Sequence, residues 1–316
     1  MIESRNKSRG RMTIKIIGTT VALALVVYLL WRQGWSEIST VVSQISFGIF
    51  TLTFVMTLMS RTAIGWRWHI LLRSAGIKIS PLRSISLTYA GLFASNFLPT
   101  TIGGDVVRLA GVLRLNLDRP VCVASLIVDR LVGMAGMALA IPFILPGLPE
   151  GLFLTANTPL LAGAPLLGKL DAPVGSKAKK ILEKGVRLLK RLLEALSFWV
   201  KHPQSLFVSL LISWTHMLLL FGTLWLLLRA MGEPASFWLI AGMWALTYFV
   251  TLLPISINGL GVQELSMTFF FTQVGGISEP TALTLAFLIR ILQMFASLPG
   301  AFYLPDVVVG EERAPA

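Results

Sequence analysis

The chain has 316 residues, of which 55% are hydrophobic and only 13% are charged, and its mean hydropathy is +0.76. Because a soluble domain carries roughly 25% charged residues, this composition excludes an ordinary soluble protein. The net charge of +12 comes from basic patches between apolar runs. This arrangement favours an anionic membrane surface as partner and excludes nucleic acid, since no segment is long enough for a basic soluble domain.

The first two apolar runs predict transmembrane helices. Residues 16–31 follow a basic N-terminus, and no small-residue cleavage site comes after them. We therefore predict a span with a cytoplasmic N-terminus rather than a signal peptide. A second span is predicted at residues 47–66, with Arg61 near its end, where a long side chain can reach the membrane surface. For the basic cluster around this end, positive-inside topology is favoured over substrate contact.

Residues 84–98 are apolar, but they number only 15 and are followed by a proline. A full crossing needs about 20 residues, so a re-entrant or broken helix is favoured here. The next span is predicted from Pro120 to about Leu145. Residues 146–168 are apolar but interrupted by prolines. If 84–98 turn back, the charge rule requires 146–168 to cross, and if 84–98 cross, it requires 146–168 not to.

Residues 169–201 hold nine basic and three acidic side chains. Apolar residues recur among them at helical spacing, which predicts a basic amphipathic helix at 177–200 on the cytoplasmic leaflet. In the second half of the chain, spans are predicted at 204–229, 236–253 and 280–304. The predicted division is a first transmembrane half, the basic helix, a second transmembrane half and a short tail, at residues 1–168, 169–203, 204–305 and 306–316. Whether the two halves are parallel or inverted stays open.

Two stretches break an apolar run in the same way. Residues 95–105 read Ser-Asn-Phe-Leu-Pro-Thr-Thr-Ile-Gly-Gly-Asp, and residues 253–264 read Leu-Pro-Ile-Ser-Ile-Asn-Gly-Leu-Gly-Val-Gln-Glu. Each has Leu-Pro, three residues, a Gly-Gly or Asn-Gly pair, and then a carboxylate. Each is followed by a proline with an arginine ten residues later, at Arg130 and Arg290. Paired broken segments in corresponding places indicate an internal two-fold repeat and a binding site within the membrane.

Arg130 and Arg290 lie inside strongly apolar runs. An arginine at the centre of a spanning helix costs roughly 2.5–3.5 kcal/mol, so both should face the bundle interior or a wet cavity. Candidate protein partners are Asp105, Asp129 and Glu264. Structural salt bridges that hold the two halves together are the alternative to a substrate-facing cavity, in which the guanidinium forks and the freed backbone N–H groups would bind an anionic headgroup. The predicted substrate-binding residues are Asn96, Pro99, Gly103, Gly104, Asp105, Arg108, Asp129, Arg130, Asn258, Gly259, Gly261, Glu264 and Arg290.

Little in the chain suggests catalysis. Cys122 is the only cysteine, so a disulfide within the chain and a cysteine metal site are excluded. His69, His202 and His216 are far apart, and for His216, inside an apolar run, a hydrogen bond between helices is favoured over a cavity-facing role. There is no nucleophile elbow, phosphate-binding loop or zinc motif. We therefore predict no enzyme activity, no cofactor and no metal.

These residues resemble a known family. Asn96-Phe97-Leu98-Pro99 with Gly103-Gly104-Asp105 and Arg108, then Asp129-Arg130, and finally Asn258 to Glu264, are similar to the transmembrane region of lysylphosphatidylglycerol synthase/flippase proteins, as is the Arg67-Trp68 pair. The resemblance implies an integral membrane module that moves lipids with charged or glycosylated phosphate headgroups between leaflets. Asn258-Gly259 departs from the expected Gly-Gly. We find no aminoacyltransferase domain within the 316 residues, so we do not expect lipid aminoacylation from this resemblance.

The expected fold is an all-α polytopic membrane bundle with about six to eight spans and two re-entrant or broken helices. The expected function is a flippase-like transporter in the plasma or inner membrane. Its lipid would be a phosphate-containing anionic, aminoacylated or polyprenyl-linked lipid, and a homo-oligomer stays open. One alternative is a non-transporting scaffold or regulator of cell-envelope lipid synthesis. The other is an intramembrane lipid-modifying transferase that uses Asp105 or Glu264 as a base.

Overall fold

The computed structural model describes residues 43–96, 98, 103–114, 118–147, 197–199, 201–253 and 256–308. The first predicted span at 16–31 lies outside these ranges, as do Pro99 and nearly all of residues 146–168 and 177–200. What the sequence predicts for those residues stays a prediction.

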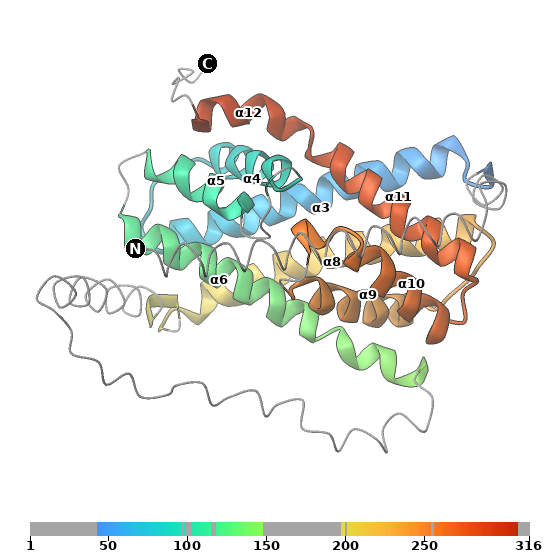
Figure 1. The fold of residues 1–316 in the computed structure, drawn as a ribbon. Helices are drawn as coiled ribbons and strands as arrows, with labels where there is room; N and C mark the ends of the chain where they lie inside the picture. The colour runs from blue at the N-terminus through green and yellow to red at the C-terminus, as the bar shows by residue number, and fades with distance from the viewer. Residues whose placement is uncertain are drawn as a thin grey trace, which may run out of the picture.

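Within the described ranges all regular structure is helical, as the sequence predicts (Figure 1). Two short 3₁₀ helices, Ile141–Gly147 and Ile257–Gly259, accompany the α-helices. The α-helices are α3 (Phe47–Ser74), α4 (Pro81–Ser95), α5 (Gly103–Leu113), α6 (Arg119–Ala138), α8 (Pro203–Ala230), α9 (Phe237–Thr251), α10 (Val262–Gln273), α11 (Glu279–Ser297) and α12 (Pro299–Val308).

Four stretches in the described ranges are long and apolar enough to cross a membrane: α3, Arg119–Leu145 (which contains α6), α8 and α11. Helix α9 has 15 residues, as α4 has, so it is shorter than the span predicted at 236–253 and shorter than the roughly 20 residues of a full crossing. The span predicted at 280–304 is interrupted, because α11 ends at Ser297 and α12 begins at Pro299.

Helix α3 is longer than the predicted span. Its start is capped by Ser46, whose side chain accepts a hydrogen bond from the N–H of Ile49. The helix does not end at Trp66, because the residues after it are buried against other helices instead of lying at the membrane surface. Arg61 is therefore 14 residues after Phe47 and 13 before Ser74. The prediction that Arg61 lies near the end of a span is wrong, and it lies at the helix midpoint.

Close backbone approach fixes the pair formed by α4 and α5, which flank the first break. A Cβ added to Gly104 would lie 2.6 Å from the carbonyl oxygen of Gly91 and 2.3 Å from Oγ of Ser95. Only glycine fits at this crossing. The two glycines that the sequence marks at the end of the first break are thus explained in part by packing.

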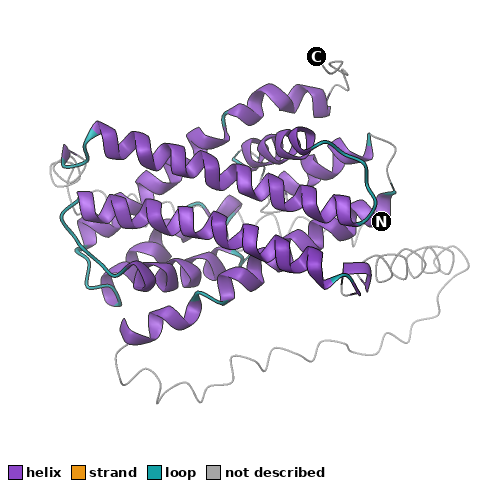
Figure 2. Ribbon diagram, turned by 180° about the vertical axis from the view of Figure 1, so that it is seen from behind, coloured by secondary structure: helices purple, strands orange, loops and turns teal. Residues whose placement is uncertain are grey.

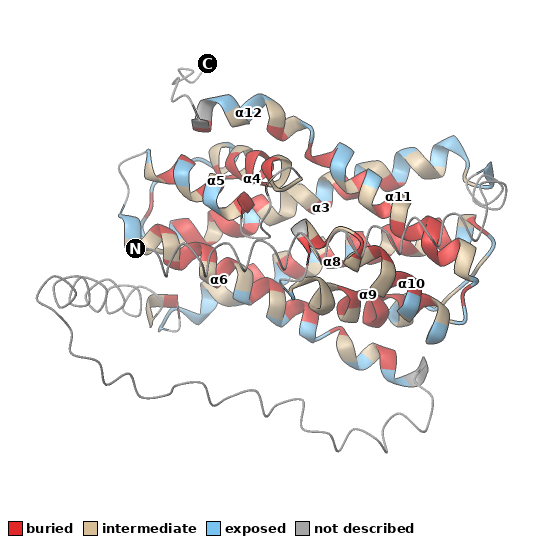
Figure 3. Ribbon diagram, in the orientation of Figure 1, coloured by how far each residue is buried: buried red, intermediate tan, exposed pale blue. Residues whose placement is uncertain are grey.

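The two halves of the described bundle meet along α3 and α8, which pack against each other and run in opposite directions (Figure 1). Seen from behind, the long helices lie roughly along one common direction (Figure 2). Buried side chains form one main cluster in each half, around Trp68 and Leu87 in the first and around Phe221 and Phe271 in the second. Figure 3 shows that buried residues concentrate where the helices face one another.

The outer faces of the long helices are apolar as well. Exposed side chains recur at helical spacing on α3, at Leu52, Val55 and Met59, and on α8, at Phe207 and Leu211. Apolar side chains on the outside of a bundle are expected when lipid, not water, is the surrounding solvent. The composition, the four long helices and these faces together identify a multi-pass membrane protein.

Candidate functional site

Five charged side chains of the first half form one connected network. Asp129 accepts a hydrogen bond from Nε of Arg67 at 2.7 Å and two from Arg108, from Nη1 and Nη2, both at 3.1 Å. Arg108 also donates to Asp105 at 3.2 Å, and Asp105 pairs with Arg130. Three arginines from α3, α5 and α6 thus share two aspartates. The carboxylate of Asp129 is only 2% exposed, and its charge is neutralised by protein partners.

Neutral side chains extend this network. Arg67 donates from Nη1 to Oγ of Ser213 on α8 at 2.8 Å. The guanidinium of Arg108 lies 4.2 Å from the ring centroid of Trp68, and the indole N–H of Trp68 donates to Ser125. The network therefore ties α3, α5, α6 and α8 together, and the Arg67-Trp68 pair is part of it.

The second break is held by a similar contact. Arg290 pairs with Glu264, and its Nη2 also donates to the carbonyl oxygen of Gly259 at 3.1 Å. Glu264 in turn accepts the backbone N–H of Gly261 at 2.8 Å, which caps α10. Asn258, Gly259 and Gly261 all have positive φ, at 49°, 69° and 75°. Asn258 therefore takes the left-handed conformation that a glycine would take, and asparagine tolerates it. This explains the departure from Gly-Gly.

The two halves use the same ion-pair arrangement. In each, a carboxylate in the first turn of the helix after the break pairs with an arginine of the following helix, 25 residues later for Asp105 and Arg130 and 26 for Glu264 and Arg290. The predicted partnering of these arginines with nearby carboxylates is confirmed. Each pair lies within one half, however, so neither holds the two halves together.

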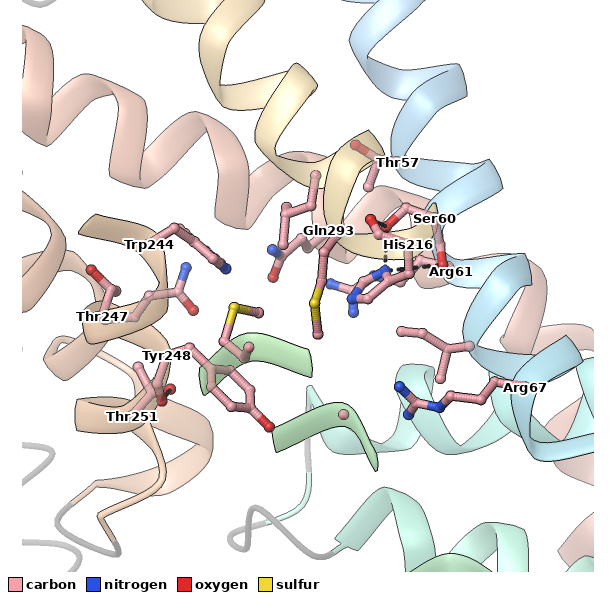
Figure 4. A pocket seen from close by; sticks show the side chains of 16 residues that line it. Thr57, Ser60, Arg61, Arg67, His216, Trp244, Thr247, Tyr248, Thr251 and Gln293 are labelled. Atoms are coloured by element: carbon pink, nitrogen blue, oxygen red, sulfur yellow. Dashed lines mark hydrogen bonds between the residues drawn. The ribbon is translucent and has the colours of Figure 1, made fainter. Parts of the chain in front are cut away.

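A polar cavity of about 230 Å³ lies between the two halves. Residues from α3, α6, α8, α9, α10 and α11 line it. Figure 4 shows the side chains of Arg61, Trp244 and Gln293 pointing into it. His216 of α8 also lines it, and its Nδ1 lies 2.6 Å from Oγ of Ser60 on α3. The predicted hydrogen bond of His216 between helices is confirmed, and the ring lies at the cavity as well.

A second cavity, of about 180 Å³, joins the two breaks. Asn96 from the first break, Asn258 from the second, and Arg290 line it. The amide of Asn96 donates to Oγ of Ser297 on α11 at 2.8 Å, so the end of α4 is tied to the second half. The two cavities share the lining residues Arg61, Gln263 and Gln293. The shared residues make the two cavities adjacent.

Several donors at these cavities lack protein acceptors. Arg61 has no carboxylate partner among the residues that the structure describes. The indole N–H of Trp244 and the amide nitrogen of Gln263 are buried and have no hydrogen-bond partner there either. Unpaired polar groups at membrane depth are costly. The larger cavity is therefore suited to an anionic group that is rich in hydrogen-bond acceptors.

Other predicted site residues lie elsewhere. Asp105 and Arg130 line an apolar groove of about 290 Å³ between α5 and α6, and the side chain of Arg130 is 40% exposed. Gly103 and Gly104 are buried at the start of α5, where Gly104 contacts α4. The structure thus brings Asn96, Asn258 and Arg290 together and leaves Arg130 apart from them.

Sequence reasoning missed the main lining of the larger cavity. From the sequence, Arg61 is interpreted as a topology signal, Gln263 is included only as a member of the second break, and Gln293 is not singled out. A signal for α3 is present, because Thr53, Thr57 and Arg61 are spaced four residues apart in a mostly apolar stretch. Such a stripe indicates a polar face. Gln263 lies within the second break, and no comparable signal marks Gln293.

Comparison with protein families shows the family of this chain. The family model described as the lysylphosphatidylglycerol synthase TM region matches residues 15–300. No curated protein matches the chain. Because the family match covers both halves of the bundle and nearly all of the 316 residues, the chain belongs to the family of the lysylphosphatidylglycerol synthase transmembrane region.

Proposed function

We propose that this protein is a flippase-like transporter that moves a phosphate-containing lipid between the leaflets of the membrane. The observation that carries the proposal is Arg61, which lines a polar cavity at the midpoint of α3 and has no carboxylate partner among the described residues. A charged side chain that faces a cavity inside a membrane bundle is by default a candidate for a substrate path. Family membership agrees with this role.

In this proposal the headgroup occupies the two adjacent cavities while the acyl chains stay in the bilayer. The phosphate binds Arg61, and its oxygens accept hydrogen bonds from Trp244 and Gln263, whose donor groups have no partner in the described part of the chain. A guanidinium fork suits phosphate oxygens better than an ammonium group does. Sheltering the headgroup in this way lowers the barrier to crossing the apolar layer.

Helix lengths support an inverted two-fold repeat. Helices α3 to α6 have 28, 15, 11 and 20 residues, and α8 to α11 have 28, 15, 12 and 19. In Figure 1, α3 runs in the direction opposite to α8, and α6 runs in the direction opposite to α11. We propose that α4–α5 and α9–α10 are re-entrant hairpins that enter from opposite sides and meet at the smaller cavity. Such pairs of broken helices provide alternating access in transporters.

Charge at the helix ends supports one orientation. The end of the bundle at which α3 finishes and α6 begins is rich in arginine and lysine, whereas the end at which α8 finishes and α11 begins is mixed. The positive-inside rule then assigns the first end to the cytoplasm. The residues at the first end are Arg73, Lys78, Arg83, Arg114, Asp118 and Arg119, and those at the second are Arg229, Glu233 and Glu279.

A leaflet-exchange assay tests the transport role. The protein is reconstituted into vesicles with phosphatidylglycerol that carries a fluorescent acyl chain, and a membrane-impermeant reductant removes the outer-leaflet signal. We expect faster loss of the inner-leaflet signal with wild type than with Arg61→Gln. Arg73→Gln is the matched control, because Arg73 lies on the same helix but is exposed and lines neither cavity. Equal rates for wild type, Arg61→Gln and empty vesicles would refute transport and leave the scaffold role.

The transferase alternative is not favoured by the geometry. It needs a carboxylate free to act as a base, but Asp105 is engaged by two arginines and Glu264 by Arg290 and by the N–H of Gly261. Protonation of either carboxylate would break these contacts.

A further inference from the structure

We infer that the lipid carried by this protein has an anionic phosphate headgroup with hydroxyl groups and without an ammonium group. The inference rests on the proposed transport function and narrows its substrate class. Phosphatidylglycerol-like lipids and hydroxyl-rich polyprenyl-phosphate lipids fit this description. Aminoacylated lipids do not.

The charges that line the two cavities are the first argument. Among the described lining residues, the charged side chains are Arg61, Arg67 and Arg290, and no carboxylate is among them. Arg67 is one of three arginines that share two aspartates, and Arg290 pairs with Glu264. Arg61 has no carboxylate partner among the described residues, so the lining of the site is cationic. An ammonium group placed there would meet a like charge in a region of low dielectric, which is unfavourable.

The open hydrogen-bond donors are the second argument. Arg61, the indole N–H of Trp244 and the amide nitrogen of Gln263 can all donate, and an indole N–H cannot accept. A phosphate brings only acceptors at neutral pH and so complements all three groups. An ammonium group brings only donors and leaves all three without partners.

Threonine hydroxyls at the same cavity supply the matching acceptors. Thr57, Thr247 and Thr251 line the larger cavity, and each donates its hydroxyl proton to a backbone carbonyl within its own helix, at 2.8, 3.0 and 2.6 Å. Their oxygens therefore keep lone pairs for an outside donor. A glycerol or sugar hydroxyl satisfies these lone pairs without adding positive charge. This favours a hydroxyl-bearing headgroup next to the phosphate.

The lysine ester of phosphatidylglycerol gives the sharpest contrast. It has the same phosphate and the same acyl chains as phosphatidylglycerol, but its two ammonium groups make the headgroup cationic. A site built for it would need at least one carboxylate beyond those that neutralise protein arginines. Asp105, Asp129 and Glu264 are each held by at least one arginine.

Competitive binding tests the inference on the full-length protein in detergent. Equimolar phosphatidylglycerol and its lysine ester, with identical acyl chains, are added, and bound lipid is counted by native mass spectrometry. We expect wild type to bind phosphatidylglycerol about tenfold or more tightly than the lysine ester. The loss of one hydrogen bond to a charged group weakens binding by at least that factor. Arg61→Gln should remove most of this preference, and Arg61→Lys should keep part of it. Arg73→Gln should bind as wild type does.

An added negative charge makes the test two-sided. Gln293→Glu adds a carboxylate to a residue that lines both cavities with Arg61. It should weaken phosphatidylglycerol binding and raise the share of the lysine ester. If wild type prefers the lysine ester, or if Arg61→Gln leaves the preference unchanged, the inference is overturned while lipid transport stands. If wild type binds neither lipid, nor a polyprenyl phosphate added as a third probe, the proposed function itself fails.

Discussion

Arg67 donates to Asp129 at 2.7 Å across the interface between α3 and α6, and the two side chains are 8% and 2% exposed. Asp129 also accepts both hydrogen bonds from Arg108. One carboxylate therefore compensates two arginines in the interior of a membrane bundle. Its removal leaves Arg108 with Asp105 and leaves Arg67 without a carboxylate partner among the described residues.

Asp129→Asn is expected to destabilise the protein by about 3–5 kcal/mol, because it removes the carboxylate of a buried ion pair and leaves the arginines in place. Asp118→Asn is the matched control, since Asp118 is exposed and its side chain makes no capping hydrogen bond at the start of α6. It should cost less than about 1 kcal/mol. Thermal unfolding in detergent measures both. Equal unfolding temperatures for the two variants would mean that Asp129 does not hold the helices together.

Arg290→Gln is expected to destabilise the protein more than Arg130→Gln does. Arg290 is 13% exposed and binds both Glu264 and the carbonyl of Gly259, whereas the side chain of Arg130 is 40% exposed and can be replaced at lower cost. The difference should be at least about 1 kcal/mol. Denaturant-dependent unfolding followed by intrinsic tryptophan fluorescence provides the comparison. A greater loss from Arg130→Gln would contradict this ranking.

Arg61→Gln is expected to raise the unfolding temperature of the lipid-free protein while it lowers lipid exchange. An unpaired cation at membrane depth costs free energy, and its replacement by a neutral side chain relieves that cost. Functional sites commonly carry such a trade-off between stability and activity. Scanning calorimetry with and without added phosphatidylglycerol measures the change. A large drop in stability without lipid would show that Arg61 has a structural role.

Asn258→Gly should change stability by less than about 0.5 kcal/mol, whereas Asn258→Val should cost more than about 1 kcal/mol. The reason is the positive φ of 49° at this position, which glycine adopts freely and a β-branched residue does not. Both variants keep the ion pair between Glu264 and Arg290 in place. Unfolding of the two side by side isolates the backbone effect, and similar losses for both would point to the asparagine side chain instead.

Much of the architecture follows from local sequence. Apolar runs with few charges predict the positions of α3, α6, α8 and α11, because each helix satisfies its own backbone inside the membrane. The prolines and glycines of the two breaks predict interruptions of the helices independently of the tertiary structure. The pairing of Arg130 and Arg290 with carboxylates also followed from the sequence, since a buried cation needs a partner.

Which arginine stays uncompensated was decided only by tertiary structure. The partner of Arg67 is 62 residues away, and the groups around Arg61 come from α8, α9, α10 and α11. The local pattern of α3 marks a polar face that includes Arg61, but it does not show that Arg67 has a carboxylate partner whereas Arg61 has none among the described residues. The sequence therefore determined that cations lie in the membrane and that two helices break there. The packing of the two halves determined which cation is open to a lipid, because ion pairing depends on distances between helices that sequence spacing does not specify.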